Sequence, residues 1–219
     1  MIKITLPDGS VKEFASGVTP MEVAKSISEG FARNVISASF NGTTVETTTP
    51  LTTDGSLILY TWNDEDGKKA FWHSTSHVMA QVLEQMYPGI KLTLGPARAN
   101  GFYYDVDFEE HKITEADFKK IEDRVLEISR GKHEFKLRPV SKADALELYK
   151  DNVYKTEMIT NLEDGTITFC DHDTFTDLCR GGHIPNTGII KAMKIMSVAG
   201  AYWRGDEKNK QLTRVYGIT

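Results

Sequence analysis

The first 62 residues alternate hydrophobic and polar positions over short stretches, as half-buried strands do. This pattern predicts strands at 2–6, 11–14, 35–40, 43–47 and 56–61. A helix is expected after Thr19, because Thr19 and Glu22 have capping-box spacing and Pro20 suits the first helical position. Gly30 can end this helix. Two strands, a helix and further strands in so short a span form a compact β-grasp pattern.

Residues 63–69 are polar and charged, and we place a domain boundary there. The longer region that follows mixes helical and strand periodicities. It predicts helices at 70–87, 114–129 and 141–149, and strands at 91–94, 102–108, 166–170, 189–198 and 211–216. Asp164 and Gly165 are expected to form a hairpin turn before the strand at 166–170. The sequence thus predicts an α+β fold with domains at 1–62 and 63–219.

The composition is that of an ordinary globular chain, with 40% hydrophobic and 26% charged residues among 219. No apolar run approaches the roughly 18 residues of a membrane span, and no secretory signal is visible at the start. Cys170 and Cys179 are too few for a disulfide framework. We therefore expect a protein of the reducing cytoplasm, without a membrane partner.

Charge is distributed unevenly along the chain, although the net charge is only −5. Residues 189–219 have a net charge of +4, from six lysines and arginines against Asp206 and Glu207. The six are Lys191, Lys194, Arg204, Lys208, Lys210 and Arg214. Both a solvated surface and a local basic face that meets phosphates explain this segment. The overall charge argues against a uniformly basic nucleic-acid binder, and no DNA partner is expected.

Two histidines are candidates for chemistry. His73 and His77 are four residues apart on an expected helix, so their rings share one face. The opposite face carries a hydrophobic stripe, made of Val78, Met79, Val82, Leu83 and Met86. The pair is therefore either two surface histidines or part of a site, and truncating either ring is expected to remove no core volume. A zinc protease would need a glutamate where this chain has Ser74.

A second cluster runs from Cys179 to His183, in which a cysteine and a histidine flank Gly181 and Gly182. Together with the first histidine pair, these side chains make a credible zinc set. They could equally form a metal-free hydrolytic site in which histidine acts as a base or positions water. A buried cysteine beside a glycine turn is the structural alternative. Asp177 precedes the cluster and could bind a substrate amine.

Other enzyme classes lack their sequence signatures here. The chain has no phosphate-binding loop of NTPases and no nucleophile elbow of α/β-hydrolases. It also lacks the paired CxxC motifs of a zinc ribbon. These three classes are therefore not expected.

Four motifs in a fixed order resemble the N-terminal part of bacterial threonyl-tRNA synthetases. They are His73-Ser-Thr-Ser-His77, Gly95-Pro96 with Asn100-Gly-Phe-Tyr-Tyr-Asp-Val-Asp107, Asp177-Leu-Cys-Arg-Gly-Gly-His183, and Val198-Ala-Gly-Ala-Tyr-Trp-Arg-Gly-Asp206. The resemblance covers essentially the whole chain. It implies a ubiquitin-like TGS domain over 1–62, followed by the α+β editing domain that these enzymes share with alanyl-tRNA synthetases.

The resemblance implies hydrolysis of seryl-tRNA(Thr), with the serine-charged acceptor end of tRNA(Thr) as the partner. Serine is threonine without one methyl group, and a binding pocket rejects such a difference only by about 10–200-fold. Accurate translation needs roughly 10⁴-fold, so a second, hydrolytic site is expected. The alternative is a noncatalytic tRNA-binding or regulatory module with a structural zinc site.

The resemblance also assigns roles to the two clusters. His73 and His77 would position water or transfer protons, and Cys179 and His183 would complete that wall of the site. The same four side chains are the candidate ligands for zinc.

Three further residues follow from the resemblance. Lys155 is the best match to the family's editing lysine, and it would stabilise charge or donate a proton at the ribose. A surface lysine is the alternative at this position. Tyr104 would pack its ring against the substrate, or else be a core aromatic residue, and Asp177 would bind the substrate amino group.

The chain departs from this family in two respects. Gly182 stands where the family usually has proline, which loosens the loop before His183. The chain also stops before the aminoacylation core, so ATP, magnesium, the catalytic-core zinc and the contacts of a homodimer would belong to the rest of a full-length synthetase. We therefore expect no aminoacylation from these residues, and we expect residues 63–219 to retain the hydrolytic chemistry.

Overall fold

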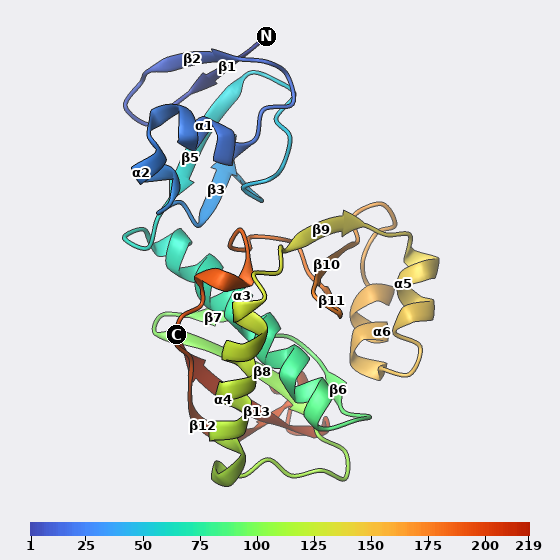
Figure 1. Ribbon diagram of the computed structural model, residues 1–219. Coiled ribbons are helices and arrows are strands. Elements are labelled where there is room, and N and C mark those ends of the chain that lie inside the picture. Colours follow the sequence, from blue (N-terminus) through green and yellow to red (C-terminus); the bar gives the residue numbers. More distant parts are fainter. The chain divides into compact units, whose positions relative to one another are not determined.

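A computed structural model describes all 219 residues and divides the chain into two compact units (Figure 1). The first unit comprises Met1–Phe71 and Gly181–Pro185. The second unit comprises Trp72–Arg180 and Asn186–Thr219. The first unit is therefore assembled from two stretches that are far apart in the sequence.

The first unit contains a five-stranded sheet with the order β2-β1-β5-β3-β4. Its strands are β1 (Ile2–Thr5), β2 (Val11–Phe14), β3 (Ser37–Phe40), β4 (Thr43–Val45) and β5 (Gly55–Tyr60). The central strands β1 and β5 run parallel, and all other neighbours are antiparallel. With the helices α1 (Pro20–Ile27) and α2 (Glu29–Ala32), this order is the predicted β-grasp.

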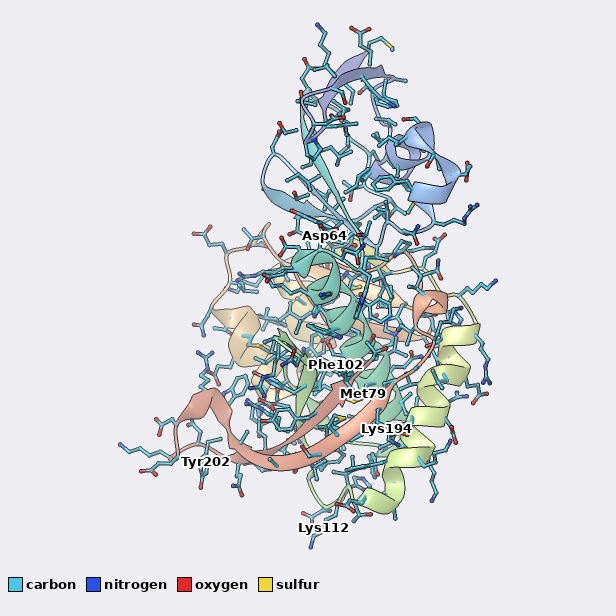
Figure 2. The ribbon with its side chains drawn as sticks, turned by 90° about the vertical axis from the view of Figure 1, so that its left-hand side faces the viewer. Asp64, Met79, Phe102, Lys112, Lys194 and Tyr202 are labelled. Atoms are coloured by element: carbon cyan, nitrogen blue, oxygen red, sulfur yellow. The ribbon has the colours of Figure 1, made fainter.

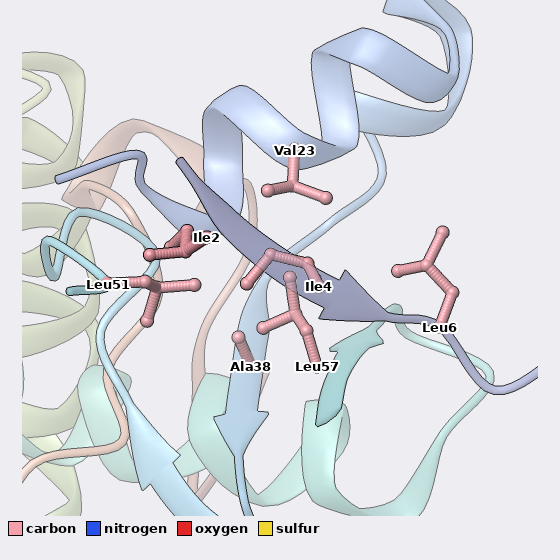
Figure 3. Packing of buried hydrophobic residues seen from close by; sticks show 7 residues of the cluster. All are labelled: Ile2, Ile4, Leu6, Val23, Ala38, Leu51 and Leu57. Atoms are coloured by element: carbon pink, nitrogen blue, oxygen red, sulfur yellow. The ribbon is translucent and has the colours of Figure 1, made fainter. Parts of the chain in front are cut away.

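The helix α1 covers the hydrophobic core of this sheet. It begins at the predicted capping box, because the Thr19 side chain accepts the Glu22 N–H while the Glu22 carboxylate accepts the Thr19 N–H. Val23 of α1 packs with side chains from the sheet and a loop (Figure 3): Ile2, Ile4, Leu6, Ala38, Leu51 and Leu57. Gly30 does not end this helix as expected, since α1 stops at Ile27 and Gly30 lies inside α2.

The second unit is built on the long helix α3 (Glu65–Met86), which begins in the first unit, and on two antiparallel sheets. The larger sheet has the order β12-β13-β8-β6, with β7 paired to β8. Its strands are β6 (Lys91–Leu92), β7 (Ala97–Arg98), β8 (Gly101–Asp107), β12 (Lys194–Tyr202) and β13 (Gln211–Ile218). The smaller sheet contains β9 (Lys136–Pro139), β10 (Thr168–His172) and β11 (Phe175–Leu178).

Three more helices complete the second unit, and its mixture of elements confirms the predicted α+β class. They are α4 (Glu115–Arg130), α5 (Lys142–Leu148) and α6 (Val153–Thr160). Met79 of α3 and Phe102 of β8 are fully buried in the interior, whereas Lys112 and Tyr202 lie at the periphery (Figure 2). None of the helices combines the length and the hydropathy that crossing a bilayer requires.

The helix α3 is buried on its polar face as well as on its hydrophobic stripe. Ser74, Thr75 and Ser76 are completely inaccessible, and His77 is 3% exposed. The expectation that His77 could be truncated without loss of core volume is therefore wrong. The hydrophobic stripe of a helix identifies one buried face, but it does not reveal whether other segments cover the polar face.

Two connections differ from their expected forms. Asp164 and Gly165 do form a turn, but the element before it is α6, so the turn joins a helix to β10 and makes no hairpin. The strand expected from residue 189 begins only at Lys194, because Thr187–Ile189 form a short 3₁₀ helix.

The basic segment near the C-terminus is largely neutralised by carboxylates of the same unit. Four of its six cations form ion pairs: Lys194 with Glu122, Arg204 with Glu157, Lys210 with Asp107, and Arg214 with Asp105. The structure therefore favours a solvated surface over a contiguous basic face for these four side chains.

Candidate functional site

Three of the predicted site residues come together in the second unit. His73 and His77 lie one turn apart on α3, and Cys179 directly follows β11. The His73 Nε2 atom lies 3.3 Å from His77 Nε2 and 3.1 Å from Cys179 Sγ. The two imidazoles and the thiol therefore direct their reactive atoms at one point.

The second ring nitrogen of each histidine, Nδ1, lies beside an oxygen atom. His73 Nδ1 lies 3.2 Å from the Gly95 carbonyl, and His77 Nδ1 lies 3.1 Å from Asp177 Oδ2. Ser76 Oγ also donates to the Gly95 carbonyl, which fixes that oxygen beside α3. Since these oxygens accept, we assign the Nδ1 hydrogens to both rings, which leaves the two Nε2 atoms facing each other. Two facing lone pairs 3.3 Å apart would repel, so either one Nε2 atom carries a proton that the other accepts or a cation binds to both.

Electrostatics favour a positive charge on His77. Burial disfavours the charged ring, but the hydrogen bond to Asp177 and the contact with Cys179 outweigh burial and raise the pKa of His77. Burial likewise opposes the charge on Asp177, yet Lys155 and His77 hold the pKa of that carboxyl well below its usual range. His77 and Asp177 are therefore well suited to hold a proton next to His73 and Cys179.

Asp177 is the centre of a buried polar network. Lys155 Nζ donates to its Oδ1, and Tyr104 Oη donates to its Oδ2 over 2.6 Å. Asp177, Lys155 and Tyr104 are exposed by 2%, 1% and 0%. Burial, followed by the charge of Asp177, raises the pKa of Tyr104, so the phenol stays a neutral donor. A substrate amine would reach Asp177 only by displacing one of these partners.

Lys155 lies in the first turn of α6, and the surface interpretation of this lysine is wrong. The Asn152 side chain caps α6 by accepting the N–H groups of Tyr154 and Lys155, each over 3.1 Å. This cap directs Lys155 inward, where its ammonium group lies 5.9 Å from the centre of the Tyr149 ring. The roles in substrate contact expected of Lys155 and Tyr104 remain predictions.

His183 belongs to the other unit, in the segment Gly181–Pro185. It is 1% exposed, and its Nδ1 atom lies 2.9 Å from Glu46 Oε1. Only three residues separate His183 from Cys179 in the sequence. At about 3.3–3.6 Å per residue, an extended chain keeps the two Cα atoms within about 14 Å of each other.

Glu46 was not among the predicted site residues, because no local pattern connects it to a histidine so distant in sequence.

The donor set suits zinc as well as a metal-free site. Two imidazole nitrogens and a cysteine sulfur are ordinary zinc ligands, and in the structure their donor atoms lie within 4.8 Å of one another. Metal-binding histidines usually donate their second N–H to a carboxylate or carbonyl oxygen, and such an oxygen lies beside the Nδ1 atoms of both His73 and His77. In a metal-free site, a water molecule beside the two Nε2 atoms could contact both rings.

Two segments of the chain match known domain families. A profile described as the TGS domain matches residues 2–61. A profile described as the threonyl and alanyl tRNA synthetase second additional domain matches residues 166–216. The chain thus contains a TGS domain and a segment that matches the second additional domain of threonyl and alanyl tRNA synthetases.

The relatives that align with the whole chain are threonine–tRNA ligases. The chain is 87% identical to the enzyme of Flavobacterium johnsoniae over 219 residues, and 85% identical to that of Flavobacterium psychrophilum. It is 53% identical to the enzyme of Cytophaga hutchinsonii over 221 aligned positions. The chain spans 34% of the length of each of these relatives. The resemblance to threonyl-tRNA synthetases is therefore confirmed over about a third of the length of these relatives.

Proposed function

We propose that this chain is the proofreading part of a threonyl-tRNA synthetase and that it hydrolyses seryl-tRNA(Thr) to serine and tRNA(Thr). The observation that carries the proposal is the convergence of His73, His77 and Cys179 beside the buried Asp177–Lys155 pair. The full-length enzyme would ligate threonine to tRNA(Thr) as a homodimer, using ATP, magnesium and a core zinc ion that its other domains bind. The reaction belongs to the cytoplasm, where tRNA is charged.

The proposed reaction uses water as the nucleophile. A water molecule held by the Nε2 atoms of His73 and His77 attacks the ester carbonyl carbon of the serine. A histidine takes one proton from this water, the bond from the carbonyl carbon to the terminal ribose oxygen breaks, and the protonated histidine returns that proton to the ribose oxygen. Asp177 orients His77, Lys155 keeps Asp177 ionised, and Cys179 lies beside the His73 ring. By the resemblance alone, His183 would be a further member of this site.

The first prediction concerns selectivity between the two esters. We expect the protein to hydrolyse seryl-tRNA(Thr) about 10²-fold faster than threonyl-tRNA(Thr), because the extra methyl group would displace the attacking water and a displacement of about 1 Å costs that much. Half-saturating protein concentrations should be similar, since both esters share the tRNA. Single-turnover hydrolysis at saturating protein measures both quantities. Equal rates for the two esters would contradict a proofreading role.

The second prediction concerns zinc. If His183 joined His73, His77 and Cys179 around zinc, four protein ligands would close the coordination sphere and leave no position for water. We therefore expect chelation to preserve seryl-tRNA(Thr) hydrolysis and added zinc to slow it. Elemental analysis of the purified protein, with single-turnover rates before and after chelation, tests this. One tightly bound zinc per chain and no hydrolysis would instead support the noncatalytic module with a structural zinc site.

A further inference from the structure

Glu46 binds the loop that carries His183, within the first unit. It directly follows β4 and is only 7% exposed. Its carboxylate accepts the backbone N–H groups of Gly182 and His183, each over 3.1 Å. The Nδ1 atom of the His183 ring lies 2.9 Å from the same carboxylate. Three donors from two consecutive residues thus converge on one buried acid.

We propose that Glu46 is a positioning residue that sets the orientation and tautomer of His183. This inference rests on the proposed function, because it concerns the histidine that would complete the hydrolytic site. A carboxylate accepts hydrogen bonds, so the hydrogen of the neutral ring resides on Nδ1 and Nε2 is its acceptor atom. Nε2 is then the atom with which His183 would act on water.

The third contact separates positioning from simple anchoring of a loop. The two backbone bonds hold the loop, but neither of them involves the His183 ring. The bond at Nδ1 adds a fixed ring plane and a fixed tautomer, and a charged acceptor makes it stronger than a neutral one. Carboxylates that orient reactive or metal-binding histidines through the second ring nitrogen act in this way.

The backbone at Gly182 matches this arrangement. Its φ of +88° lies in the left-handed region, which proline cannot adopt and other side chains rarely do. A Cβ atom there would also lie 3.3 Å from Thr44 Cγ2. Glycine at this position therefore does more than loosen the loop, because it allows the N–H to reach Glu46. Residues 63–219 alone would lack Glu46, so we now expect them to hydrolyse the ester more slowly than the whole chain.

The test compares Glu46→Gln with the wild type in the whole chain. Glutamine keeps the size but offers one acceptor oxygen, so it cannot accept three N–H groups. We expect the single-turnover rate on seryl-tRNA(Thr) to fall about 10–100-fold, with the half-saturating protein concentration unchanged. Glu13→Gln is the matched control, since Glu13 is an exposed glutamate on β2 of the same unit, and it should react at the wild-type rate.

Two further measurements make the outcome decisive. In ¹⁵N NMR spectra, the ring signals lost in His183→Ala identify this ring, and we expect the Nδ1–H tautomer in the wild type. An Nε2–H tautomer would overturn the proposal, even if Glu46→Gln failed to fold. Added to His183→Ala, Glu46→Gln should slow the reaction no further, and an undiminished additional loss would show that Glu46 acts only on the loop. If the wild type hydrolysed no seryl-tRNA(Thr), the proposed function would fail, while the tautomer would still decide the role of Glu46.

Discussion

Replacing His73 with alanine is expected to slow seryl-tRNA(Thr) hydrolysis by about 10²–10⁴-fold, the usual contribution of a positioned general acid or base. Its Nε2 atom faces both His77 and Cys179, so its loss removes the common member of the cluster. His73 is only partly buried, and we expect the free energy of unfolding to fall by about 1 kcal/mol. Single-turnover kinetics and urea unfolding of the same preparation measure the two effects separately.

His111→Ala is the control for this experiment, because His111 is an exposed histidine of the same unit that contacts the Pro88 carbonyl. It should leave the hydrolytic rate unchanged. A wild-type rate for His73→Ala would remove the histidine cluster from the mechanism. His77→Ala should slow hydrolysis as well, but it also removes one buried partner of Asp177 and costs about 1–3 kcal/mol of stability. For that reason His73 is the cleaner position to test.

The largest effect on stability is expected for Lys155→Met. The ion pair between Lys155 and Asp177 is almost fully buried, with side chains 2% and 3% exposed. Removing one partner of a buried pair leaves the other charge without compensation, which costs about 3–5 kcal/mol. His77 and Tyr104 still contact Asp177, so we expect the lower end of this range. Urea denaturation at neutral pH measures the change.

Two variants control this measurement. Lys150→Met removes an exposed lysine from a surface pair with Glu147 and should change stability by less than about 0.5 kcal/mol. Asp177→Asn added to Lys155→Met should recover part of the loss, because the uncompensated charge is then gone. A loss below about 1 kcal/mol for Lys155→Met, or no recovery in the double variant, would mean that the pair contributes little to the fold.

Local signals in the sequence were sufficient for most elements of the fold. The alternation of Ile2, Ile4 and Leu6 predicts β1, and the capping box of Thr19 and Glu22 predicts the start of α1. Each of these signals depends on residues within a few positions of one another. The weakly amphipathic helix α6 was missed for the same reason, since no hydrophobic stripe marks it, although the cap at Asn152 could have indicated it.

The candidate site was predictable only as far as short spacings define it. The spacing of His73 and His77 and that of Cys179 and His183 were visible directly. The partners of these residues were not, because Glu46 and His183 are 137 positions apart and no periodicity links them. Burial of Lys155 was also hidden, since a single lysine in a weakly patterned helix gives no indication of the acid it will contact.

The first unit draws residues 181–185 from a distant part of the chain, and this has a consequence for exchanging modules between related proteins. A chimera that receives residues 1–71 from another parent would combine a foreign residue 46 with the resident loop. Each substitution at position 46 then has to suit the backbone of residue 182 and the ring of residue 183. The part to exchange therefore consists of two separated segments, residues 1–71 and 181–185. A graft should preserve function best when both segments come from the same parent.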